Sequence, residues 1–170
     1  MEDFAHRILR AIRLEAALYE EVKADESALP QAVVIVILSS IAGGLGEAQR
    51  ALFLGIAISL ISWFIWAYFI YIIGTKWLPE YQTQSNLKGM LRVLGFASAP
   101  GILRIFSVIL PIRKTIFFIT TIWTIIAMIV AVRQALNYKS TARAAIVCFI
   151  AWLAQAMILG SLLALMMKGH

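Results

Sequence analysis

The sequence predicts an all-α, polytopic integral membrane protein. It would form a bundle of five transmembrane helices with an N-terminal amphipathic interfacial helix and a Pro-Gly break in the third span. Of the 170 residues, 62% are hydrophobic and only 14% are charged, whereas soluble domains average roughly half apolar and about a quarter charged. Mean hydropathy is +0.87. These values exclude a water-soluble globule and a disordered tail, and the single cysteine, Cys148, excludes an internal disulfide framework.

Residues 1–28 form the first predicted element, a cytoplasmic amphipathic helix. Apolar side chains such as Phe4, Ile8 and Ile12 recur on one face at helical spacing. The segment lacks the continuous apolar core of a signal peptide, so we expect it to lie along the inner membrane surface or to pack under the bundle. Glu15 falls on the apolar face, and we therefore expect it to have a partner.

Residues 29–170 form the predicted transmembrane domain. A span needs about 20 residues to cross roughly 30 Å of hydrocarbon. The second and fifth segments contain no charge and are long enough to tilt, whereas the first is short and the third contains Arg104. The five segments are residues 29–46, 51–74, 91–110, 115–132 and 144–167.

Basic residues set the predicted orientation, because cytoplasmic loops carry an excess of lysine and arginine. With the N-terminus inside and the C-terminus outside, ten basic residues face the cytoplasm and four face outward. We therefore expect a multi-pass protein of the inner (cytoplasmic) membrane whose basic loops contact anionic lipid. The inner group is Arg7, Arg10, Arg13, Lys23, Lys76, Lys88, Arg92, Arg133, Lys139 and Arg143, and the outer group is Arg50, Arg113, Lys114 and Lys168.

The third span contains the most informative stretch, with Gly95, Pro100 and Gly101 close together. Proline removes a backbone donor and disfavours helix in the residue before it, while glycine lets another helix approach closely. These residues predict a broken or kinked helix near the middle of the membrane. One interpretation is a packing kink against the glycine-rich end of the first span, residues 43–46. The other is a transporter-type break that binds an ion or substrate, and we favour packing.

Arg104 follows this break inside the apolar zone, where an unpaired charge costs about 3 kcal/mol. Candidate partners are Glu47 and the carbonyls freed at the break. One interpretation of Arg104 is an anion-binding or gating charge. The other is an arginine whose side chain snorkels to the outer headgroups. Both alternatives stay open.

A second set of charged residues predicts a clamp on the inner side. Arg92 and Arg133 flank the third and fourth spans and could pair with acidic residues of the amphipathic segment, fixing it to the bundle. Those acidic residues are Glu20, Glu21 and Asp25.

The last span has small residues at Ala156, Gly160 and Ala164, four apart on one face. This spacing permits close helix contact within the bundle or between subunits, and we favour internal packing. Gln155 in the same span should hydrogen-bond across helices or face a polar lumen.

Enzyme chemistry finds little support in the sequence. General acid-base catalysis needs paired carboxylates or a histidine in a pocket, but the two histidines, His6 and His170, lie near opposite ends. The glycines at 43–46 lack the lysine and hydroxyl of a phosphate loop. We therefore expect no catalytic residue, no cofactor and no metal site, and no aromatic-basic surface for nucleic acid.

Four sequence elements together resemble the Yip family of membrane proteins, named for interaction with Ypt/Rab GTPases. They are ALYEEV at 17–22 with Asp25, QA at 31–32, GFASAPG at 95–101, and VRQALNY at 132–138, which includes Gln134 and is followed by ST at 140–141. The resemblance implies five spans, a cytosolic N-terminus and, for eukaryotic members, a role in vesicle traffic. This chain lacks their long polar N-terminal region and so resembles the compact bacterial branch, for which a GTPase partner is not expected.

Two functional hypotheses follow. The first is a non-enzymatic, membrane-organising or trafficking-like scaffold that uses helix packing and lipid contact. The alternative is a small transporter or channel with its site at the broken third helix. It would work as a homo-oligomer, because five helices leave little room for a pore within one subunit. We expect membrane lipids as partners in either case.

Overall fold

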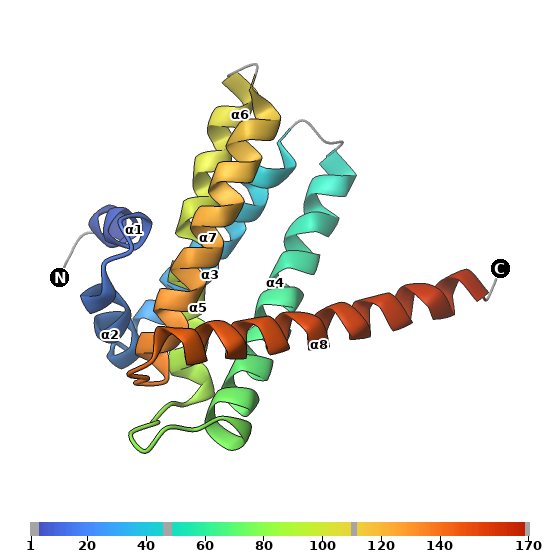
Figure 1. Cartoon of the computed structure of the whole chain (residues 1–170). Helices are drawn as coiled ribbons and strands as arrows, with labels where there is room; N and C mark the ends of the chain where they lie inside the picture. The colour runs from blue at the N-terminus through green and yellow to red at the C-terminus, as the bar shows by residue number, and fades with distance from the viewer. Residues whose placement is uncertain (1–3, 46–48, 110–111, 169–170) are drawn as a thin grey trace.

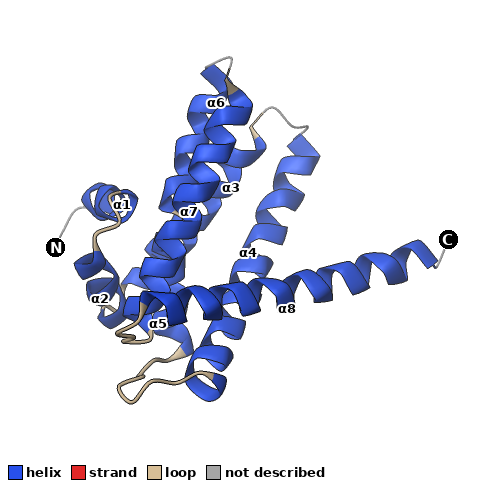
Figure 2. Cartoon of the chain, in the orientation of Figure 1, coloured by secondary structure: helices blue, strands red, loops and turns tan. Residues whose placement is uncertain are grey.

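The computed structural model describes residues 4–45, 49–109 and 112–168, and every regular element in this part of the chain is helical. Figure 2 shows the helices joined by short loops, with one longer loop before α5. The elements in chain order are α1 (Phe4–Ile12), α2 (Ala16–Ala24), α3 (Ala28–Gly44), α4 (Gln49–Ile72), a π-helical turn η1 (Ile73–Trp77), α5 (Leu87–Ala97), a 3₁₀ segment η2 (Ala99–Ile105), α6 (Phe106–Ile109), α7 (Arg113–Ala135) and α8 (Thr141–Lys168).

The N-terminal segment is two short helices, and the prediction of one amphipathic helix is wrong on this point. The chain turns between α1 and α2, where Leu14 adopts a positive φ of 61°. The turn lets Ala11 on α1 and Leu18, Tyr19 and Val22 on α2 become buried, and α2 packs on α5 and α7. Burial of apolar area against the bundle therefore replaces burial in the membrane surface.

Three helical segments are long and apolar enough to cross a membrane: Leu52–Trp77, Arg113–Ala135 and Thr141–Ile158. Ala28–Gly44 is a shorter apolar helix, about 26 Å long at 1.5 Å per residue. The predicted third span is divided into α5, η2 and α6. The structure thus has three candidate spans, whereas five were predicted. The helices of the first and third predicted segments are shorter than a regular spanning helix.

The core is built around α5, because every residue from Gly89 to Ala97 is buried. This short helix packs against α2, α3, α4 and α7. The long helices α4, α7 and α8, by contrast, carry exposed apolar side chains such as Phe53, Phe118 and Trp152. A hydrophobic exterior around a packed centre is expected for helices that contact lipid.

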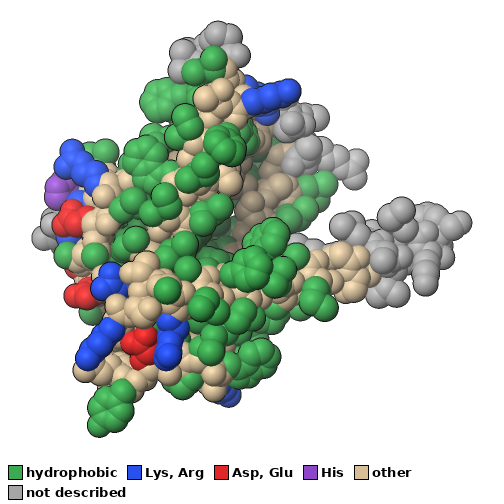
Figure 3. All heavy atoms as spheres, in the orientation of Figure 1, with side chains coloured by type: hydrophobic (Ala, Val, Ile, Leu, Met, Phe, Trp, Pro, Cys, Tyr) green, Lys and Arg blue, Asp and Glu red, His purple; other side chains and the backbone are tan. Residues whose placement is uncertain are grey.

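The helix α8 runs across α7 and α4, and its C-terminal half extends away from the other helices (Figure 1). Its first half packs on α4 and α7. Figure 3 shows hydrophobic side chains over α7 and α8, with most charged side chains gathered toward the end that holds α1, α2 and the loops. The small-residue face predicted for internal packing is exposed at Ala156, and a Cβ on Gly160 would meet nothing within 4 Å. The side chain of Ala164 lies outside the described part.

Candidate functional site

The charges of α1 and α2 form one cluster, which we call the N-terminal charge cluster: Arg7, Arg10, Glu21 and Asp25. The two arginines lie one turn apart on α1, and the turn between the helices places them beside Glu21 of α2. Arg7 is buried and its guanidinium reaches Glu21 at 2.7 Å and Asp25 at 2.8 Å. Arg10 lies 2.7 Å from Glu21. Arg10 also lies 3.1 Å from Glu15, so Glu15 has a partner, as we expected from its place on the apolar face.

This arrangement changes the pKa of both carboxyls in the cluster. Burial alone would raise the pKa of Glu21, but hydrogen bonds and charge from Arg10 and Arg7 outweigh it and lower the pKa. The pKa of Asp25 is lowered by hydrogen bonding from Ser27 and then from Arg7. Both groups are therefore held in their charged form as the counter-charges of the two arginines.

The predicted clamp has a different set of partners. Arg92 is buried, and its Nη2 donates to the backbone carbonyl of Lys23 instead of a carboxylate. Arg133, in the last turn of α7, donates through Nε to the carbonyl of Tyr138, 3.3 Å away, in the loop that follows this helix. Arg92 and Arg133 therefore do not pair with Glu21 or Asp25, because the nearer arginines of α1 occupy those carboxylates.

The other predicted residues of this region contribute less. The side chain of Glu20 is exposed on α2, and its charge acts on Lys23. Gln134 is partly buried, and its backbone carbonyl accepts from the amide of Asn137. Glu47, the proposed partner of Arg104, lies outside the described residues.

Other contacts join the N-terminal helices to the bundle. Trp123 on α7 donates its indole N–H to the carbonyl of Ile12, 2.9 Å away, at the end of α1. Lys23 donates from Nζ to the side chain of Asn137 and to the carbonyl of Gln84, both at 2.9 Å. The amphipathic segment is thus bound to the bundle by hydrogen bonds at both of its helices.

The helix break is a close-packed contact with α3. A Cβ on Gly95 would lie 2.5 Å from the Cβ of Ala32, and one on Gly101 would lie 2.0 Å from Oγ of Ser39. Pro100 is buried near the start of the 3₁₀ segment η2. The break therefore lets the backbone approach α3, as the packing interpretation expected, although along the middle of α3 rather than at residues 43–46.

Arg104 lies at the end of η2 and reaches across to α7. Its Nε and Nη2 are each 3.4 Å from a hydroxyl, those of Thr120 and Thr121, and its guanidinium lies 5.4 Å from the centroid of the Phe117 ring. In the described part of the chain no carboxylate lies within ion-pair distance of it. Its polar contacts are therefore long and with neutral partners.

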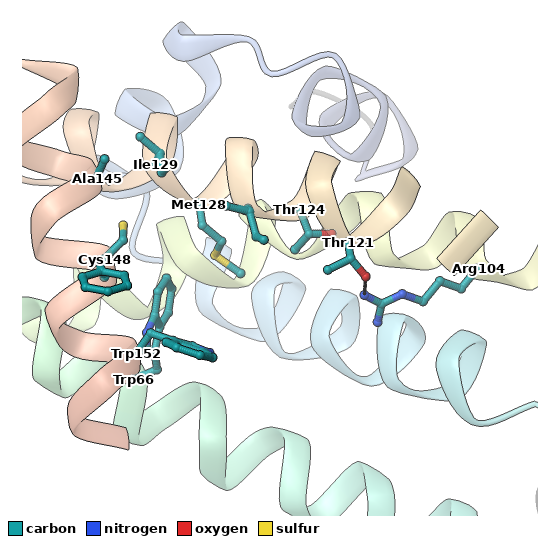
Figure 4. A pocket seen from close by; sticks show the side chains of 11 residues that line it. Trp66, Arg104, Thr121, Thr124, Met128, Ile129, Ala145, Cys148 and Trp152 are labelled. Carbon is teal, nitrogen blue, oxygen red and sulfur yellow. Dashed lines mark hydrogen bonds between the residues drawn. The ribbon is translucent and has the colours of Figure 1, made fainter. Parts of the chain in front are cut away.

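A groove of about 590 Å³ extends from Arg104 between α4, α7 and α8. We call it the α7–α8 groove. Arg104 and Thr121 lie at one end, and Trp66, Trp152 and Cys148 lie at the other (Figure 4). Its remaining lining residues are Thr124, Ile125, Met128, Ile129, Ala145 and Phe149. The groove is thus apolar along most of its length, with a positive charge at one end.

The loop after α7 holds the opposite end of the bundle together. Tyr138 is buried, and its hydroxyl donates toward the carbonyls of Gly74 and Leu78, at 2.8 Å and 2.6 Å. Burial is the main cause that raises the pKa of Tyr138 to about 12. Leu136 packs against Gly74, where an added Cβ would lie only 2.4 Å from its side chain. Gln155 makes the cross-helix bond expected of it, donating to the carbonyl of Ser62 at 3.3 Å.

Sequence reasoning missed several residues of these sites. Arg7 and Arg10 counted only as orientation charges, although their one-turn spacing on the amphipathic segment was a usable signal. Thr121 had no signal, because hydroxyls in apolar helices usually bond their own backbone. Trp66 and Trp152 come from helices far apart in the sequence. Among the described residues, no group of three or more His, Cys, Asp or Glu side chains could hold a metal ion.

The comparisons with known proteins give one match. The Yip1 domain family model matches residues 16–163, most of the chain. No curated protein and no solved structure matches. The matched region includes all four sequence elements that carried the resemblance, and several of them meet in space, as Ala32 and Gly95 do.

Proposed function

This chain belongs to the Yip1 domain family, and from that membership and the packing of its helices we propose that it is a non-enzymatic membrane scaffold. The observation that carries the proposal is the close fit of the broken helix against α3. Gly95 and Gly101 leave no room even for a methyl group at these contacts. A break used for packing supports a structural role, since backbone approaching a neighbouring helix this closely is not lining a cavity.

We also propose that five segments cross the membrane. Beside the three regular candidates, α3 would cross with local thinning of the bilayer. The path through α5, η2 and α6 is about 36 Å long, from 1.5 Å per α-helical and about 2.0 Å per 3₁₀ residue. The distribution of basic residues supports an inner-membrane location with the N-terminus in the cytoplasm and the C-terminus outside.

The exposed apolar faces suit lipids and further copies of the chain as partners. The free face of α8 at Ala156 and Gly160 supports a homo-oligomer, because small residues permit close helix approach. The transporter alternative would place a substrate at Arg104, the charge that faces the α7–α8 groove.

Flux and vesicle shape in liposomes that contain the purified protein test the proposal. We expect no protein-dependent flux across a panel of ions and small solutes, and a protein-dependent change in vesicle diameter at constant lipid composition. Arg104→Ala is expected to leave the absence of flux unchanged. Saturable flux that Arg104→Ala abolishes would overturn the scaffold function in favour of transport.

A further inference from the structure

We propose that the α7–α8 groove binds one anionic phospholipid, with its phosphate at Arg104 and an acyl chain along α7 toward Trp152. This proposal rests on the proposed scaffold function, because it names the lipid that the scaffold would hold. It concerns binding only, and so can be tested without any transport or shape assay.

Charge supports a phosphate at the Arg104 end. The guanidinium has five N–H donors in a fork that matches phosphate oxygens. The contacts to Thr120 and Thr121 are 3.4 Å long, and no carboxylate of the described residues pairs with it. A charge inside the apolar zone is costly unless it is paired or hydrated. A lipid phosphate would supply the missing counter-charge, with Thr121 as an additional hydroxyl donor.

The rest of the groove suits an acyl chain. Beyond Thr124 its walls are apolar or aromatic, including Ile125, Met128 and Phe149. Its volume of about 590 Å³ lies within the roughly 300–1,000 Å³ of ligand pockets. Thr121 and Ile129 are eight residues apart on α7, so the groove extends about 12 Å along this helix. It therefore follows the helix axis, as the chain of a lipid would.

The geometry favours one leaflet. Arg113 begins α7, and Thr121 lies eight residues further, about 12 Å into the helix. The 23 residues of α7 have their midpoint near Thr124. The charge at Arg104 thus lies on the Arg113 side of that midpoint, and the apolar end of the groove lies beyond it, toward Ala135. A lipid of that leaflet would insert with its phosphate drawn inward, since buried arginines locally thin the bilayer and admit water.

The test uses the unmodified chain in detergent, titrated with phosphatidylglycerol or with phosphatidylcholine of the same acyl chains. Native mass spectrometry gives the ratio of the two affinities. Cys148, the single cysteine, lines the groove, so its rate of alkylation by N-ethylmaleimide locates the lipid. We expect a preference of roughly fivefold for phosphatidylglycerol, equivalent to about 1 kcal/mol, and slower alkylation when it is bound.

The variant Arg104→Gln should reduce the affinity ratio to near one. Arg113→Gln is the matched control: it removes the same charge from an arginine that also lies over Phe117, 5.6 Å from the ring, but does not line the groove. It should keep the preference. Arg104→Lys should keep most of it, and this variant tests the charge if the glutamine variant folds poorly.

Several outcomes would overturn the proposal. Equal affinity for the two lipids in the unmodified chain would remove the phosphate site, as would a preference that survives Arg104→Gln. Protection of Cys148 by inorganic phosphate alone would remove the acyl chain from the groove. If protection of Cys148 from alkylation depends on the protein concentration and not on lipid, the groove is occupied by a second copy of the chain.

Discussion

Adding a methyl group at Gly95 is the sharpest test of the close packing between α5 and α3. In Gly95→Ala the new Cβ would lie 2.5 Å from the Cβ of Ala32 and 3.0 Å from both its Cα and its carbonyl oxygen. Two of these three atoms belong to backbone, which cannot rotate away. The two helices would have to separate, and α5 is buried on all sides from Gly89 to Ala97.

The expected cost follows from two opposing effects. Overpacking a well-packed core costs typically about 1–3 kcal/mol, while replacing glycine by alanine in a helix gains up to roughly 1 kcal/mol. Gly55→Ala on α4 isolates the second effect, because a Cβ there would meet nothing within 4 Å. The difference between the two variants is thus about 2 kcal/mol. In a chain of this size that corresponds to a midpoint difference of roughly 4–8 °C.

The assay is thermal unfolding in one detergent, followed by tryptophan fluorescence. Gly95→Ala should melt below the unmodified chain, and Gly55→Ala at or above it. Ala32→Gly removes the shortest contact, so Gly95→Ala should lower the midpoint less in the Ala32→Gly background than in the unmodified chain. Equal midpoints for Gly95→Ala and Gly55→Ala, or the same loss from Gly95→Ala in both backgrounds, would refute the packing interpretation of the break.

Three further predictions concern the end of the bundle that holds α1, α2 and the loop after α7. Arg7→Met should cost about 2 kcal/mol in unfolding, since it removes one arginine partner from each of two partly buried carboxylates, Glu21 and Asp25, whereas Arg13→Met on the exposed side should stay within about 0.5 kcal/mol. Tyr138→Phe should cost about 1–2 kcal/mol, measured the same way, because two carbonyls lose a buried donor. Finally, the lowered pKa values of Glu21 and Asp25 stabilise the fold above the ordinary carboxyl range. The melting midpoint should therefore fall as pH drops from about 5 to 3, and less steeply in Glu21→Gln.

The all-helical fold and its family could be predicted because both depend on local signals. Long apolar runs identify helices that lose little by facing lipid, and α4, α7 and α8 occupy those runs. The division of the N-terminal segment could not be predicted. The chain turns at Leu14, a residue that rarely adopts positive φ. Burial of Tyr19 and its neighbours against the bundle and the ion pairs between α1 and α2 stabilise the turn.

The ion pairs were harder to predict than the break. Pro100 and its flanking glycines mark a break whatever surrounds them, but a carboxylate pairs with whichever arginine the fold brings nearest. Glu21 had candidates at Arg92, Arg133 and the α1 arginines, and sequence spacing alone does not rank contacts between helices. Once α1 turns back over α2, Arg7 and Arg10 are the nearest.

The 3₁₀ segment connects the packing site to the charged end of the groove. In a 3₁₀ helix the side chains at positions i and i+3 lie on the same side, which places Gly101 and Arg104 together over α3. Gly101 allows the backbone to approach Ser39, and Arg104 then passes Gly43, where an added Cβ would lie 3.7 Å from its Nη1. With α3 so close beneath it, the side chain continues outward to Thr121 on α7. The same break that packs two helices together therefore directs one guanidinium into the α7–α8 groove, so packing and ligand binding need not be alternative uses of this part of the chain.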